Sequence, residues 1–109
     1  MPSTQLSDRY ASRVQILKAL AHPTRLFLVE ELAKSEYCVR ELTERVGDDI
    51  STVSKHLAVL RDAGVLGSER RGQQIYYQLR VPCVLDVFRC VEGVLDEDEK
   101  GAKSCRVGN

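Results

Sequence analysis

The spacing of apolar residues predicts two helices in the first third of the chain. One is expected from Ser7, as its N-cap, to about Leu20, with an apolar residue at every third or fourth position. Ala21-His22-Pro23 interrupts this pattern. A second helix is expected from Thr24 to about Lys34, because proline is favoured in a first helical turn. Residues 1–6 are expected to form a frayed end.

Two further helices are predicted on either side of a tight turn. The first spans about Val39–Val46, and the turn is Gly47-Asp48-Asp49. The second opens at Ile50-Ser51, with Ser51 as the expected N-cap, and closes at Ala63-Gly64. This spacing is typical of a helix-turn-helix. The residues expected to face inward on the later helix are Val53, Leu57, Val59 and Leu60.

A β-hairpin is predicted directly after this pair of helices. Residues 65–70 and 74–79 form two short extended runs joined at Arg70-Arg71-Gly72-Gln73. Ile75, Tyr77 and Leu79 alternate with polar or amphipathic residues, so one face of the hairpin should be buried. A short polar helix can fit a DNA major groove, and an arginine-tipped hairpin can lie on neighbouring phosphates or in the minor groove. The pattern therefore predicts a winged helix-turn-helix.

The last predicted helix, from near Pro82 to about Leu95, is apolar over well more than half of its circumference. Such a helix at the end of a small domain needs cover on two sides, and a symmetry mate is the simplest cover. The expected fold is mainly α with a small β-hairpin, forming a homodimer through terminal helices. Residues 1–95 are expected to form one DNA-binding and dimerisation domain, and residues 96–109 a flexible tail.

Charge distribution supports nucleic acid as the partner. The net charge of the 109 residues is zero, yet residues 51–80 hold five basic groups against two acidic ones. No apolar run approaches membrane-spanning length and no signal-peptide core is present, so a cytoplasmic protein without membrane contact is expected. The sequence offers no nucleophile–base pair, carboxylate dyad or phosphate-binding glycine loop, which argues against an enzyme.

Candidate DNA-binding residues lie on the leading part of the later helix and at the hairpin tip. Short hydroxyls can reach phosphates or base edges, and lysine or arginine suits phosphate or guanine. Some have a structural alternative: Ser51 as a plain cap, and His56 packed against Tyr77 or a neighbouring helix. The hairpin tip could also be merely solvated. His22 is expected to serve structurally at the start of the second helix. The candidates are Ser51, Thr52, Ser54, Lys55, His56, Arg70, Arg71 and Gln73.

Four segments together resemble the ArsR/SmtB family of winged-helix repressors. They are A-L-A-H-P-T-R-L at 19–26, C-V-R-E-L at 38–42, S-T-V-S-K-H-L-A-V-L-R-D-A-G-V-L at 51–66 and R-R-G-Q-Q-I-Y-Y-Q-L at 70–79. The resemblance implies a homodimer that binds double-stranded DNA at an imperfect inverted repeat in its own promoter region. It implies no cofactor for DNA binding, and an inducer that lowers DNA affinity.

The inducer sites known in the resembling family are incomplete here. Arsenite-sensing members open the third helix with C-V-C-[DE]-L and carry a further cysteine three positions on, whereas this chain keeps Cys38 but has Arg40 and Thr43 at the other two positions. Zinc-sensing members use Asp-x-His on the last helix, and here Asp86 is followed two residues later by Phe88.

Cysteines offer another inducer site, with Cys38, Cys83 and Cys90 as the candidate metal ligands. Seven helical residues separate Cys83 from Cys90 by about 10.5 Å along the axis, whereas two thiolates on one metal lie at most about 4.6 Å apart. An antiparallel partner, Cys38, or Cys105 from the tail could complete the site. Thiolates favour arsenite, antimonite or another soft metal ion. One alternative is a persulfide- or oxidant-sensing repressor in which Cys38 and a cysteine of the last helix cross-link, and the other is that the cysteines merely pack.

Overall fold

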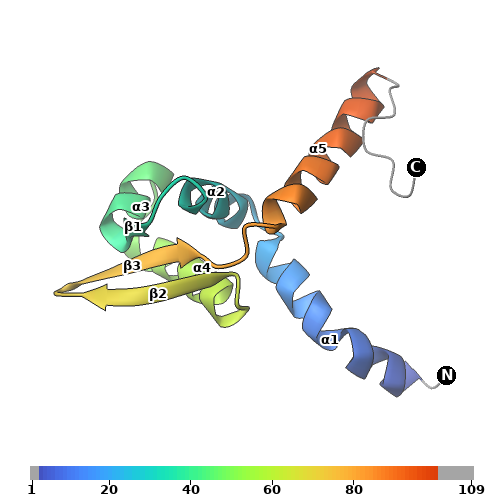
Figure 1. Ribbon diagram of the computed structural model, residues 1–109, viewed down its shortest axis with the longest axis horizontal. Helices are drawn as coiled ribbons and strands as arrows, with labels where there is room; N and C mark the ends of the chain where they lie inside the picture. Colours follow the sequence, from blue (N-terminus) through green and yellow to red (C-terminus); the bar gives the residue numbers. More distant parts are fainter. Residues whose placement is uncertain (1–2, 101–109) are drawn as a thin grey trace.

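The computed structural model describes residues 3–100, and their side chains from 6 to 96. Figure 1 shows a body from which two helices, one near each end of the chain, lead away in different directions. The principal extents of 48 × 41 × 21 Å reflect these projecting helices. The elements in chain order are α1 (Ser3–Leu20), α2 (Pro23–Leu32), β1 (Tyr37–Cys38), α3 (Val39–Val46), α4 (Ile50–Asp62), β2 (Leu66–Arg71), β3 (Gln74–Leu79) and α5 (Val84–Lys100).

The helix ends at both termini of the chain differ from prediction. α1 begins at Ser3 rather than Ser7, because no proline or glycine interrupts residues 3–6. α5 begins after the expected Pro82 and continues past Leu95, because D-E-D-E-K at 96–100 lacks a helix breaker before Gly101. Residues 96–100 are therefore helical rather than tail. The rest of the predicted tail, including Cys105, lies outside the described residues.

The hairpin belongs to a three-stranded antiparallel sheet in the order β1-β3-β2. The expected two strands are confirmed, but sequence analysis missed β1, which pairs Tyr37 with Tyr77 and Cys38 with Tyr76. β2 and β3 join through Gly72-Gln73, and Gly72 has the positive φ of 64° that such a tight turn favours. Tyr77 is buried, whereas Ile75, nearer the tip, is 37% exposed because the hairpin extends beyond the core (Figure 1).

The core is built from the inner faces of the three central helices. α4 contributes a fully buried stripe of Val53, Leu57 and Leu60, while Val59 is exposed and not inward-facing as predicted. The stripe packs in one cluster with fully buried Leu28 and Val29 of α2 and Leu42 of α3. Burying aliphatic side chains of this kind contributes roughly 1.5–3 kcal/mol each, so α4 is held firmly by one face.

α1 and α5 leave much of their apolar surface uncovered. On α5, Val84 is buried and Phe88 packs partly on the core, but Val87 and Val91 are about half exposed. Leu17 on α1 is 59% exposed. The expectation that the last helix lacks sufficient cover within one chain therefore agrees with the structure. Within residues 3–100, no helix has both the length and the apolar character needed to cross a membrane.

Candidate nucleic-acid interface

The turn between α3 and α4 is fixed by one glycine and one aspartate. Gly47 ends α3 in the left-handed conformation, at φ 82°, and its N–H donates to the Thr43 carbonyl. Asp49 is the N-cap of α4, and its Oδ1 accepts from the Thr52 N–H at 2.7 Å. This bond is the main reason that the pKa of Asp49 is lowered. The helix-turn-helix geometry is thus specified locally.

The prediction that Ser51 caps α4 is wrong. Ser51 lies inside the first turn, and its hydroxyl donates to Asp49 Oδ1 at 2.8 Å. A carboxylate competes well for this position, because it can accept from a backbone N–H and a hydroxyl together. The consequence is that the cap lies two residues earlier than predicted and α4 begins at Ile50, with two carboxylates, Asp48 and Asp49, in the preceding turn.

The leading face of α4 carries four of the predicted side chains. Ser51 and Lys55 are exposed, whereas Thr52 and Ser54 are partly buried. Among the side chains that the structure describes, none forms an ion pair with Lys55. Because the opposite side of α4 supplies the buried stripe, this polar face is directed away from the core. It is available to an external partner.

The fifth α4 candidate, His56, is engaged inside the protein. Its Nδ1 accepts from Arg25 Nε at 3.1 Å, and its ring centroid lies 4.4 Å from that of His22. His22 is the N-cap of α2, where its Nδ1 accepts from the Thr24 N–H at 3.1 Å. The structural role predicted for His22 is confirmed. For His56, packing against a neighbouring helix occurs, and a DNA contact stays a prediction.

The hairpin arginines differ from each other. Arg71 forms ion pairs with Glu69 at 2.7 Å and Glu36 at 2.8 Å, and its guanidinium lies 4.7 Å from the Tyr76 ring centroid. Hydrogen bonds to both carboxylates raise the pKa of Arg71. Arg71 therefore fastens the hairpin to the segment before β1, which sequence analysis did not foresee. Arg70 is exposed and lacks an ion pair within the described part of the chain.

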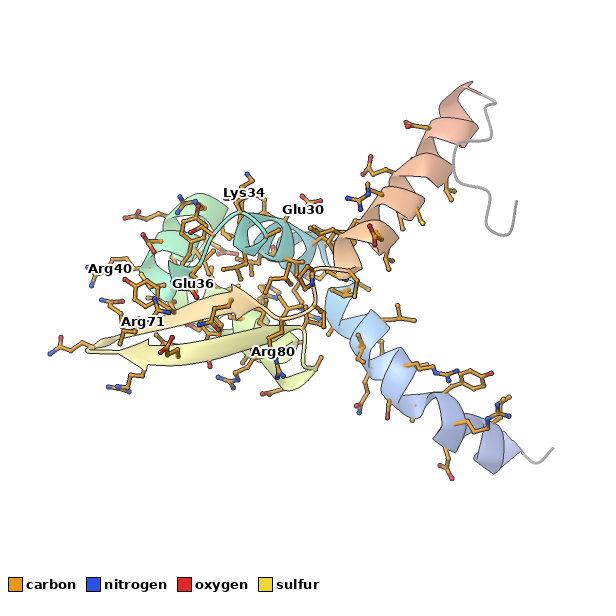
Figure 2. The ribbon with its side chains drawn as sticks, viewed as in Figure 1. Glu30, Lys34, Glu36, Arg40, Arg71 and Arg80 are labelled. Atoms are coloured by element: carbon orange, nitrogen blue, oxygen red, sulfur yellow. The ribbon has the colours of Figure 1, made fainter. Side chains whose placement is uncertain are left out.

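Arg40 was not among the predicted DNA-binding residues. It is exposed on α3, and Figure 2 shows Arg40 and Arg71 at the end of the molecule from which the hairpin projects. The first helix of a helix-turn-helix crosses the DNA backbone. Position on that helix was the signal that could have identified Arg40 as a phosphate-contact candidate.

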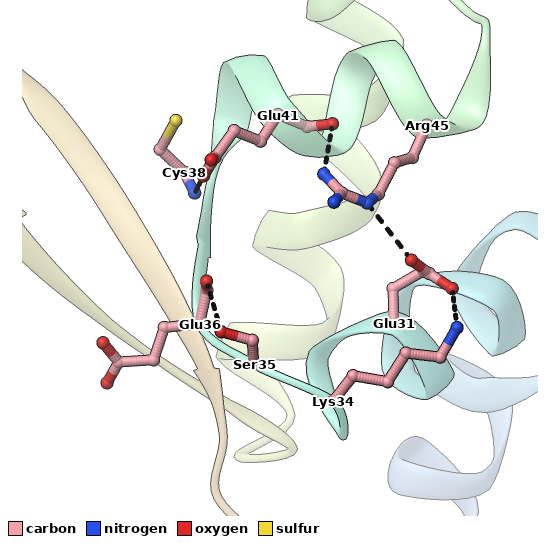
Figure 3. A network of polar contacts seen from close by, with 7 residues as sticks. All are labelled: Glu31, Lys34, Ser35, Glu36, Cys38, Glu41 and Arg45. Atoms are coloured by element: carbon pink, nitrogen blue, oxygen red, sulfur yellow. Dashed lines mark hydrogen bonds and ion pairs between the residues drawn. The ribbon is translucent and has the colours of Figure 1, made fainter.

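Cys38 lies in a polar network at the β1–α3 junction (Figure 3). It is buried, and its backbone N–H donates to Glu41 Oε1 at 2.9 Å, which lowers the pKa of Glu41. Arg45 connects this helix to α2 through an ion pair with Glu31 at 3.3 Å. Arg45 also lies over the Tyr37 ring, 4.0 Å from its centroid. The surroundings of Cys38 are those of a helix cap.

The structure does not assemble the predicted metal ligands within one chain. Cys83 and Cys90 are exposed free thiols, and Cys83 precedes the first residue of α5. Figure 1 places β1 and the start of α3, where Cys38 lies, at the opposite end of the molecule from α5. Among the described residues, no three His, Cys, Asp or Glu side chains come together to hold a metal ion. A site shared between subunits stays a prediction.

Comparison with known proteins identifies the family. Residues 22–68 match the model described as bacterial regulatory protein, arsR family. The chain is 37% identical over 102 residues to the biofilm growth-associated repressor of Xylella fastidiosa, covering 94% of this chain and 90% of that protein. The chain belongs to the arsR family. The resemblance inferred from the four sequence segments is therefore confirmed.

Two further proteins extend the comparison. The arsenic resistance transcriptional regulator ArsR1 of Pseudomonas putida is 36% identical over 86 residues, covering 78% of this chain and 67% of that protein. The solved homodimeric winged helix-turn-helix domain of Mb0332 from Mycobacterium bovis has a TM-score of 0.74 at 26% identity, covering 90% of this chain and 91% of that one. The winged helix-turn-helix fold predicted from sequence is confirmed.

Replacing the true cap should weaken the fold more than replacing the predicted one. Asp49→Ala should lower the thermal midpoint, and Ser51→Ala should lower it less, because only Asp49 accepts from the helix N–H group. Since the pKa of Asp49 is lowered on folding, its contribution is present above the ordinary aspartate pKa and is lost as pH falls through the folded value. Circular dichroism melts should therefore show the Asp49→Ala deficit shrinking from about pH 7 to about pH 3. A larger deficit for Ser51→Ala would contradict the assignment.

Proposed function

We propose that this protein is a homodimeric transcriptional repressor that binds an inverted-repeat DNA operator and is released by a thiol-reactive inducer. One observation carries the DNA-binding part: α4 is held by a fully buried stripe while its opposite face presents Ser51 and Lys55 to solvent. Arg70 on the hairpin and Arg40 on α3 add exposed cations on neighbouring elements. A polar helix flanked by cations suits a major groove between two phosphate backbones.

The uncovered faces of α1 and α5 support a dimer. An open hollow of about 230 Å³ lies between α1, α2 and α5 and is lined mainly by apolar side chains. Contiguous exposed apolar surface on a small domain marks an interaction site. A two-fold dimer formed by these helices would present two α4 helices to two DNA half-sites. The apolar lining includes Leu17, Leu20, Leu26, Val87, Phe88 and Val91.

Removing an exposed cation from the proposed interface should weaken DNA binding. Lys55→Ala and Arg70→Ala should each reduce affinity and lower the slope of log affinity against log salt by about one, because each loses one phosphate contact. Lys34→Ala is the matched control, since it removes the same charge from a residue paired with Glu31 beyond the end of α2. Fluorescence anisotropy at several salt concentrations measures both quantities. Equal salt slopes for the wild type and all three variants would exclude this interface.

A charge on the exposed apolar face of α5 should separate the subunits. Val91→Glu is preferable to Phe88→Glu or Leu85→Glu, because Val91 is 53% exposed and the other two are partly buried in the chain. Sedimentation should show a folded monomer, and DNA affinity should fall because one monomer covers one half-site. Glu92→Gln, a neighbouring change that adds no charge, should remain dimeric. A Val91→Glu dimer that binds DNA normally would place the interface elsewhere.

The inducer proposed first is arsenite or antimonite, bound by cysteine thiolates near the dimer interface. Cys83 and Cys90 are exposed on or next to the helix proposed for dimerisation, and soft ions prefer thiolates. Since their spacing prevents chelation within one helix, an antiparallel partner would bring Cys83 near Cys90 of the other subunit. Cys38 and Cys105 are the other proposed contributors. Binding there would change the separation of the two α4 helices and hence the DNA affinity.

A persulfide- or oxidant-sensing repressor is the second candidate, favoured by the pair of exposed thiols outside any three-ligand cluster in the described residues. One thiolate would attack a polysulfide, forming a cysteine persulfide and releasing the shortened polysulfide. The second thiolate would attack the cysteine sulfur of that persulfide, forming a disulfide and releasing hydrosulfide. Disulfide formation needs two cysteines, whereas a three-thiolate metal site needs three.

Single cysteine replacements should distinguish sensing from packing. Cys90→Ser and Cys83→Ser should abolish release of DNA by the inducer while leaving DNA affinity unchanged, because both thiols are exposed. Anisotropy titrations of the DNA complexes with arsenite, and separately with polysulfide, measure release, and a coupling of roughly 1–3 kcal/mol would lower affinity 5- to 150-fold. Mass spectra would show an arsenic adduct or a disulfide. Release that persists in both variants and in Cys38→Ser and Cys105→Ser would refute cysteine sensing.

A further inference from the structure

Arg25 on α2 forms hydrogen bonds with two other helices. Its Nε donates to Nδ1 of His56 in α4 at 3.1 Å. Its Nη1 donates to the carbonyl oxygens of Lys18 at 3.3 Å and Ala19 at 3.2 Å. These carbonyls belong to the last turn of α1, where helices leave acceptors unsatisfied and favour a nearby cation. A single guanidinium thus joins the end of α1 to the helix proposed to enter DNA.

The hydrogen bond to α4 requires a neutral His56. An imidazole nitrogen accepts a hydrogen bond only when it carries no proton, so Nδ1 of His56 is unprotonated. His22 and Arg25 face His56 from the start of α2, and Asp48 faces it from the turn before α4. Burial, followed by the charges of His22 and Arg25, lowers the pKa of His56, while Asp48 acts in the opposite direction. The surroundings therefore favour the neutral form near pH 7.

An open surface hollow separates parts of α1 and α4 next to this link. Its volume is about 370 Å³, and it is lined by Lys18 and Ala19 of α1, by Arg25 of α2, and by Val59, Asp62 and Ala63 at the end of α4. Tight packing normally fixes the angle between two helices. Where the space between them is open, the angle between the helices depends more on the directional hydrogen bonds of Arg25.

We propose that Arg25 is a positioning residue for DNA binding, and that neutral His56 is the acceptor through which it holds α4 in register with α1. This inference rests on the proposed function, in which α4 binds DNA and α1 helps to form the dimer. A change in the dimer interface would move the end of α1 and, through Arg25, the orientation of α4. His56 then acts through Arg25 rather than by touching DNA.

Lowering the pH should change DNA affinity in opposite directions for this role and for a direct contact of His56 with DNA. Protonated His56 would direct an N–H at the Arg25 guanidinium, so the hydrogen bond would be lost and two cations would face each other. DNA affinity would then fall as pH is lowered. If His56 instead touched a phosphate, protonation would add a cation to the interface and affinity would rise.

The experiment compares the wild type with His56→Asn and Arg25→Lys. Asparagine can offer its amide oxygen to Arg25 but does not titrate, and lysine keeps the charge of Arg25 but cannot donate in the same directions. The probe is a fluorescent duplex selected by the wild-type protein from a random-sequence pool. Anisotropy is measured from about pH 8 to about pH 5.5, a range that spans histidine titration. Circular dichroism and sedimentation report folding and dimer content.

The wild type should lose roughly threefold in affinity relative to His56→Asn across this range, which corresponds to about 0.7 kcal/mol; the loss is a few-fold because the lowered pKa of His56 leaves it only partly protonated at the acidic end. Near pH 8 the two should bind within about twofold of each other, whereas Arg25→Lys should bind roughly tenfold more weakly with an unchanged salt slope. Equal pH profiles for wild type and His56→Asn, or a wild-type affinity that rises relative to that of His56→Asn on acidification, would overturn the inference. If Arg25→Lys fails to fold, the His56→Asn comparison still decides it. Failure of the proposed function is distinct, because the wild type would then select no duplex from the pool.

Discussion

The apolar stripe of α4 is the constraint on which the candidate interface depends. Val53, Leu57 and Leu60 are fully buried in the cluster that also receives α2 and α3. Once that side of the helix is committed to the core, the remaining side chains can only face outward or toward neighbouring helices. The direction of Lys55 is therefore a consequence of packing. Gly47 and Asp49 then set where α4 begins relative to α3.

Ion pairing within the chain decides which basic side chains remain available to contact DNA phosphates. Residues 51–80 carry an excess of positive charge, but the structure divides that excess unequally. Arg71 is held by Glu36 and Glu69, so it stabilises the position of the hairpin on the body. Lys55 and Arg70 keep their charge without a partner among the described side chains. An exposed, unpaired cation loses little on meeting phosphate, whereas a paired one must first give up its carboxylates.

The sequence predicted most of the fold, because helix and hairpin patterns are local. The Val39–Val46 helix, the turn at Gly47 and the hairpin were all correct. Long-range contacts were not predictable: β1 has two residues and little pattern, and the Arg71–Glu36 and Arg25–His56 bonds join distant segments. The cap of α4 was misplaced because serine and aspartate both suit that position. Cysteine spacing along one chain likewise could not reveal a site that two chains would share.

NMR of the labelled protein titrated with its selected DNA duplex tests the central claim most directly. The account predicts that the largest shifts of backbone amide signals will occur in residues 50–56 and 70–73, the start of α4 and the hairpin tip. Arg40 on α3 should also shift, whereas Val87 and Val91 on α5 should change little. Largest shifts on α1 and α5, with an unaffected α4 and hairpin, would contradict the proposed interface.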